Sequence, residues 1–156
     1  FVKHAAFLQL VRGRRLRLQR TEPNIGALAT ALADPVNPVT AQYHLAFVAS
    51  DTFYEHTHRY PGQRHDWQAD VDPLLSHAQT YCARIGLDLS DSDRVRLQHA
   101  CYELTRGAHS DTPSTAAYLG GVAAQEVIKI LTVQYIPLDN TCVYDGIVQA
   151  VSSFRL

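Results

Sequence analysis

The sequence lacks methionine altogether, holds only three cysteines among its 156 residues, and contains no long apolar run. No stretch approaches the roughly 20 apolar residues that a membrane-spanning helix needs, so no membrane partner is predicted. The formal net charge is −1, which argues against nucleic acid or an anionic membrane surface as the main partner. Because the chain begins Phe-Val-Lys without methionine, we expect it to be a piece of a longer protein.

The cysteines are Cys82, Cys101 and Cys142, and no two of them have the C-x-x-C spacing of metal or redox sites. An odd, sparse set of this kind is typical of reduced thiols in an intracellular protein. A nucleophilic thiol needs an electropositive, accessible setting, whereas all three fall on the apolar faces of predicted helices or strands. We therefore expect inert, buried thiols and predict no catalytic residue.

Motifs for nucleotides and metals are missing as well. Gly120 and Gly121 lie within a predicted helix and follow no strand, unlike a dinucleotide fingerprint, and no G-x-x-x-x-G-K-[ST] sequence occurs. His56, His58 and His65 cluster but lack the ligand spacing of a zinc site, so a solvated helix end is the favoured interpretation. The sequence thus predicts no cofactor-binding and no metal-binding residue in this chain.

Apolar periodicity and turn residues predict a mainly helical chain. Apolar side chains recur at spacings of three and four, as on one face of a helix. Ser90 is the expected N-cap of one helix, Gly86 ends the helix before it, and Pro113 opens the last one. On the helix that begins at Pro38, the apolar face is predicted to include Phe47 and Tyr54. The predicted helices span residues 25–33, 38 to about 59, 66–85, 90–107 and 112–132.

Strands are expected only near the two ends of the chain. Residues 5–11 suit a buried strand or one short helical segment, and the alternation over residues 16–18 suits an edge strand or an extended loop. Residues 141–156 predict two short strands hinged at Asp145-Gly146. The fold class is therefore α+β, with helices dominant.

The helix predicted over residues 112–132 is apolar around most of its circumference, which is typical of a buried helix. Gly120 and Gly121 lie on a strip of small residues, and we expect this strip to let a neighbouring backbone approach closely. Glu126 and Lys129 stand at an i,i+3 spacing beside Gln125. These five residues are the candidates for packing or partner contact, with pairing inside the helix as the simplest role of the charged ones.

Five arginines fall within nine residues near the start of the chain: Arg12, Arg14, Arg15, Arg17 and Arg20. Such a cluster could bind phosphate groups. The net charge of the chain and the absence of interleaved aromatic residues nevertheless argue against nucleic-acid binding. Ion pairing with an acidic partner, or with the part of the longer protein that is missing from this chain, is the preferred interpretation.

Four stretches resemble, in order, one known family. They are FLQLVRGRRL near the start, RYPG at residues 59–62, AAYLGGVAAQEVIKILT from residue 116, and the ending NTCVYDGIVQAVSSFRL. Together they resemble the regulatory subunits of neddylation-activating enzymes, within the ThiF-like superfamily that activates ubiquitin-like modifiers. The resemblance implies that residues 1–107 form a helical inserted domain, of the catalytic-cysteine type but without that cysteine. Residues 108–156 would then supply the last helix and hairpin of an inactive ThiF-like (Rossmann-type) α/β adenylation domain, whose N-terminal part is not in this chain.

The same resemblance implies a non-catalytic role in a heterodimer. A separate catalytic subunit would bind ATP and Mg, adenylate the ubiquitin-like modifier of cullins and carry its thioester, so this chain needs no cofactor. A cytoplasmic location is expected, with the nucleus as a second one. Two alternatives remain open: the inactive half of a single-chain ubiquitin-activating enzyme, and a non-enzymatic helical adaptor.

Overall fold

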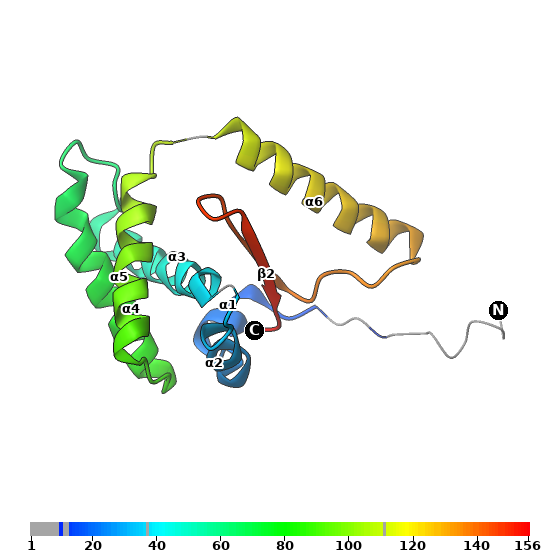
Figure 1. The fold of residues 1–156 in the computed structure, drawn as a ribbon, viewed down its shortest axis with the longest axis horizontal. Coiled ribbons are helices and arrows are strands. Elements are labelled where there is room, and N and C mark those ends of the chain that lie inside the picture. The colour runs from blue at the N-terminus through cyan, green and yellow to red at the C-terminus, as the bar shows by residue number, and fades with distance from the viewer. Residues whose placement is uncertain (1–9, 11–12, 37, 111) are drawn as a thin grey trace.

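The computed structural model describes residue 10 and residues 13–36, 38–110 and 112–156. Helices dominate this part of the chain, and one antiparallel hairpin follows the last helix, so the mainly helical α+β prediction is confirmed (Figure 1). The elements are α1 (Leu16–Thr21), α2 (Ile25–Leu32), α3 (Pro38–Thr57), the 3-10 turn η2 (Trp67–Asp70), α4 (Val71–Ile85), α5 (Asp91–Arg106), α6 (Pro113–Thr132), β1 (Thr141–Asp145) and β2 (Ala150–Phe154).

Helix α3 is the centre of the core. It contacts α2, α4, α5 and both strands, so nearly its whole circumference is covered. Even its polar Thr40 and Gln42 are buried. The prediction that Phe47 and Tyr54 belong to the buried face is wrong, because they are 52% and 43% exposed. A helix packed on several sides has no single apolar stripe, and periodicity therefore identifies its core positions poorly.

The predicted ends of the helices are confirmed where a capping residue marked them. Ser90 accepts a hydrogen bond from the backbone of Asp93, whose carboxylate accepts one from the Ser90 backbone in return. Gly86 adopts a left-handed conformation at φ +71° and ends α4. The expectation of a strand or extended loop at residues 16–18 is wrong, since they begin α1. Arg, Leu and Gln are good helix formers, and that propensity outweighs a three-residue alternation.

An internal ion pair fixes the RYPG loop that follows α3. Arg59 binds both carboxylate oxygens of Asp70 at the end of η2, with Nη2 2.5 Å from Oδ1. The backbone N–H of Gly62 donates to the same carboxylate at 2.9 Å. The side chains of Arg59 and Asp70 are only 17% and 5% exposed. The loop is thus held against the end of η2 by a charged contact rather than by apolar packing alone.

The C-terminal hairpin joins the helical core through one face. Thr141 pairs with Phe154 and Asp145 with Ala150, which confirms the predicted hinge region. Val143 and Phe154 are buried against the core. Asn140 closes the open end of the hairpin, because its side chain binds both the N–H and the C=O of Leu156.

The strand or helix predicted over residues 5–11 lies outside the described residues except for Leu10, which is exposed and not in a helix or strand. Among the described residues, no helix combines the length and apolarity needed to cross a membrane.

Candidate interaction surface on the last helix and the hairpin

The expectation that α6 is buried is wrong for the described part of the chain: none of its residues is buried there. Figure 1 shows α6 lying apart from the helical core, with the hairpin between them. Large apolar side chains are exposed on α6, on the segment that follows it and on the hairpin. This C-terminal apolar surface comprises Tyr118, Leu119, Val127, Ile128, Ile130, Leu131, Val133, Tyr135, Ile136, Ile147, Val148 and Val151.

The connections of α6 explain its position. Its first turns contact the hairpin, where the rings of Tyr118 and Tyr144 lie 4.6 Å apart between centroids. Beyond that contact the helix runs away from the core along the outside of the molecule (Figure 1). A folded protein that exposes this many large apolar side chains on one helix and its neighbouring segments usually covers them by an interaction. The prediction of an apolar helix is therefore correct. The described residues do not cover this helix.

The two glycines of α6 have open space around them. A Cβ atom built on Gly120 or on Gly121 would meet no other atom within 4 Å. The close approach of a neighbouring backbone is therefore not made by the described residues. The role of this glycine strip in packing stays a prediction.

The polar candidates of α6 do pair with each other. Lys129 Nζ donates to Glu126 Oε1 at 2.6 Å, and Glu126 Oε2 accepts from the backbone N–H of Leu138 at 2.6 Å. The Lys129 ammonium and that N–H hold the pKa of the Glu126 carboxyl below its usual range. Glu126 thus ties the segment after α6 back onto the helix, while Gln125 is exposed beside it.

The thiols have the character of unreactive groups. Cys82 and Cys101 are buried, and burial raises their pKa values to about 11 and about 12. Cys142 is half-buried rather than fully buried, and burial followed by the charge of Glu126 raises its pKa too. A thiol with a raised pKa has little thiolate at neutral pH and is a poor nucleophile.

The other clusters singled out in the sequence lie on the surface. His56, His58 and His65 are exposed, and no group of three potential metal ligands occurs among the described residues. In the arginine cluster, Arg20 forms an ion pair with Asp51 of α3. This partner lies within the chain itself, whereas a partner protein or the missing part of the chain was expected. Arg12 lies outside the described residues.

One residue without any sequence signal is His44 of α3. Its ring meets that of Phe154 edge-on at 6.0 Å, and its Nε2 is buried without a hydrogen-bond partner in the described structure. Burial, assisted by the charge of Arg20, lowers its pKa to about 4. No motif or spacing marks this position, since its environment is made by elements distant in sequence.

The lowered pKa of His44 predicts a pH-dependent stability. The group is neutral in the folded chain but protonates near pH 6.5 when unfolded, so its contribution is present above pH 6.5 and is lost as pH falls toward 4. We expect about 3 kcal/mol less free energy of unfolding at pH 4 than at pH 7 from this group. Urea unfolding at both pH values measures it, with His44→Phe as the control that keeps a ring against Phe154. A variant with the same pH dependence as the parent would contradict the assignment.

Sequence comparison identifies relatives of this chain among known proteins. No family model matches the chain. The NEDD8-activating enzyme E1 regulatory subunit of Danio rerio is 30% identical over 100% of the chain, which covers 28% of that relative. The NEDD8-activating enzyme E1 regulatory subunit AXR1 of Arabidopsis thaliana is 28% identical over 94% of the chain and 27% of its own length. The chain is a homologue of NEDD8-activating enzyme E1 regulatory subunits. The resemblance carried by the four sequence stretches is thereby confirmed.

The extent of these matches also bears on the alternatives. The ubiquitin-activating enzyme E1 1 of Schizosaccharomyces pombe is 29% identical over 74% of the chain, a smaller share than the regulatory subunits match. The single-chain alternative is therefore not favoured. The chain spans less than a third of the length of the regulatory subunits that it matches.

Proposed function

We propose that the chain acts as the C-terminal part of the regulatory subunit of a NEDD8-activating enzyme. In this role it contributes structure and subunit contact, whereas a partner catalytic subunit binds ATP and Mg²⁺, adenylates the modifier and forms the thioester. The matches over the whole chain support the regulatory role. We place the assembly in the cytoplasm and in the nucleus.

The C-terminal apolar surface is the observation that carries this proposal. Residues 108–156 would complete a ThiF-like adenylation domain, with α6 packed on a sheet supplied by another part of the subunit. An apolar helix with no cover from the described residues fits that arrangement. The helical core within residues 1–107 would be the inserted half-domain, which carries no thioester cysteine.

Substitution of Gly121 tests this packing. In the full-length subunit assembled with its catalytic partner, Gly121→Leu should lower stability by about 1–3 kcal/mol, because a branched side chain would force a close-packed helix and sheet apart. Gly121→Ala should be neutral or stabilising by up to about 1 kcal/mol through helix propensity. Thermal melts of the heterodimer measure both. If the leucine variant melts like the parent, α6 is not packed in the assembly and the proposal is wrong.

The thiols provide a second test, which concerns catalysis. Replacing Cys82, Cys101 and Cys142 together by alanine in the intact heterodimer should leave a reducible thioester between the modifier and the partner subunit. The reason is that burial keeps these thiols protonated. Non-reducing electrophoresis after incubation with ATP and the modifier detects the adduct. A thioester mapped by mass spectrometry to any of the three positions would refute the non-catalytic role.

A further inference from the structure

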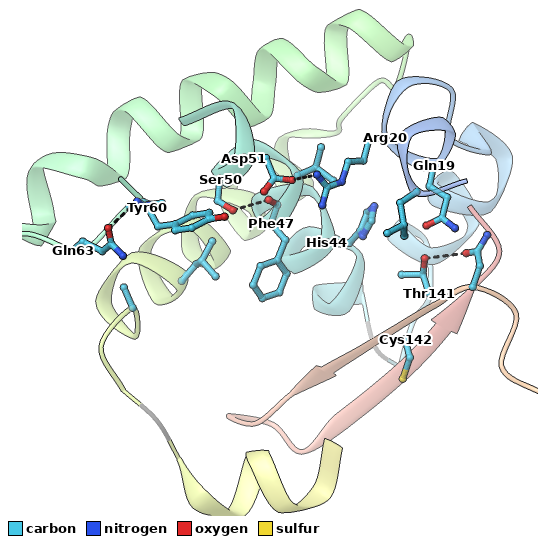
Figure 2. A pocket seen from close by; sticks show the side chains of 16 residues that line it. Gln19, Arg20, His44, Phe47, Ser50, Asp51, Tyr60, Gln63, Thr141 and Cys142 are labelled. Atoms are coloured by element: carbon cyan, nitrogen blue, oxygen red, sulfur yellow. Dashed lines mark hydrogen bonds and ion pairs between the residues drawn. The ribbon is translucent and has the colours of Figure 1, made fainter. Parts of the chain in front are cut away.

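A hollow of about 620 Å³ opens where α1, α3 and the hairpin meet, with the RYPG loop and the end of α5 closing one side. Figure 2 shows side chains from these elements around the same space, with Phe47 of α3 and Cys142 of β1 among them. The size falls within the range of about 300–1,000 Å³ that is usual for binding pockets. It can therefore receive a bulky side chain.

The mouth of this hollow exposes apolar groups that a folded protein normally covers. Leu16, Phe47 and Tyr60 all line it and are 71%, 52% and 46% exposed. They come from three different elements, so their convergence results from the fold and not from one apolar stretch of sequence. Aromatic side chains at a pocket are the usual anchors of protein–protein contacts.

Arginines are concentrated in and just before α1, the helix that borders one side of the hollow. Arg14, Arg15, Arg17 and Arg20 lie in or just before α1, and Glu22 is the only carboxylate of that segment. Arg20 is paired with Asp51 at the edge of the hollow. For Arg15 and Arg17, the described part of the chain provides no ion-pair partner, and both are exposed. Arg15 and Arg17 do not line the hollow, but they are the residues directly before and after Leu16 at the start of α1. Their long side chains are therefore within reach of a segment that lies across Leu16.

We propose that this surface binds an acidic segment of a partner protein, with one bulky apolar side chain inserted into the hollow between Leu16, Phe47 and Tyr60. Carboxylates flanking that side chain would meet the guanidinium groups of Arg15 and Arg17, where bidentate pairing is favourable. Nucleic acid fits less well, because the chain as a whole is not basic. This inference goes beyond the proposed function and does not depend on how the adenylation domain is completed.

Fluorescence anisotropy with the full-length subunit in its heterodimer tests the proposal. The probe is a fluorescein-labelled peptide with a central Leu-Phe pair flanked by glutamates, and its control carries Ser-Ser in place of that pair. We expect the Leu-Phe peptide to bind roughly tenfold more tightly than the control. Reversing both charges with Arg15→Glu and Arg17→Glu should weaken binding roughly tenfold, whereas Arg94→Glu, on exposed α5 surface, should leave it unchanged.

Cys142 reports whether the peptide occupies the hollow itself. This half-buried thiol lines the hollow. Its raised pKa makes it react slowly at neutral pH, so alkylation by N-ethylmaleimide is run at mildly alkaline pH, where the thiolate fraction is larger. Bound peptide should slow this alkylation, as measured by mass spectrometry at that site. Three results would overturn the proposal: no binding, equal binding of the Ser-Ser peptide or of an oligothymidylate of the same charge, and unchanged alkylation of Cys142. The second would show attraction of anions alone, and the third binding elsewhere.

Discussion

Replacing Gly62 by alanine should lower the free energy of unfolding by about 2–5 kcal/mol. A Cβ atom at this position would collide with the backbone carbonyl oxygen of Thr105 and lie 2.6 Å from the Cβ of Ala108. The obstacle is largely backbone at the end of α5, so it cannot yield by a change of rotamer. The left-handed φ of +82° adds about 1–2 kcal/mol for a residue with a side chain, and the forced backbone shift adds a further 1–3 kcal/mol or more.

Gly86→Ala is the matched control for this experiment. Gly86 also has a left-handed φ, +71°, but a Cβ there would meet nothing within 4 Å. The Gly86→Ala substitution should therefore lower the free energy of unfolding by only about 1–2 kcal/mol, which is the cost of the left-handed conformation alone. Chemical unfolding of both variants separates the two contributions. Equal losses at the two glycines would show that the approach of the RYPG loop to α5 is looser than described.

The helix boundaries were predictable because local chemistry determines them. The Ser90 cap, the Gly86 stop and the Pro113 start each act through hydrogen bonds or dihedral angles of neighbouring residues, and all three mark helix ends in the structure. The burial of Cys82 and Cys101 was predictable for a related reason. Each lies on an apolar helical face, and such a face is buried when the core around it is complete.

Features that depend on distant parts of the molecule were not predictable. The apolar sequence of α6 indicates that something covers it, but periodicity carries no information on whether that cover lies within 156 residues. Six residues of α1 are too few to show a helical period against a chance alternation of Leu and Arg. Likewise, Leu16, Phe47 and Tyr60 are separated in sequence, so the hollow that they line has no sequence signature.

The ion pair between Arg59 and Asp70 was not predictable from the sequence either. RYPG is visible in the sequence as a turn, yet nothing local indicates that its arginine binds the last residue of η2. That carboxylate also accepts from Gly62, so one buried charge holds the loop at two points. The loop that carries Tyr60 to the edge of the hollow therefore depends on Asp70, a residue that no sequence pattern marks.

We expect Asp70→Ala to destabilise the protein by about 3–5 kcal/mol, because it leaves the largely buried Arg59 guanidinium without its partner. The N–H of Gly62 loses its acceptor in the same step. Urea unfolding monitored by circular dichroism measures the loss. The exposed pair of Asp139 and Arg155 is the control, and Asp139→Ala should cost about 1 kcal/mol or less.

Removing both charges should be less harmful than removing one, because the double variant leaves no unpaired buried ion. Arg59→Leu combined with Asp70→Leu should therefore be more stable than the sum of the two single changes predicts. The pH dependence gives an independent check. Arg59, and next the Gly62 N–H, hold the pKa of Asp70 below its usual value, so this stabilisation is present at neutral pH and is lost as pH falls below about 4. Additive single and double variants would mean that the two charges do not interact, and that apolar packing alone positions the loop.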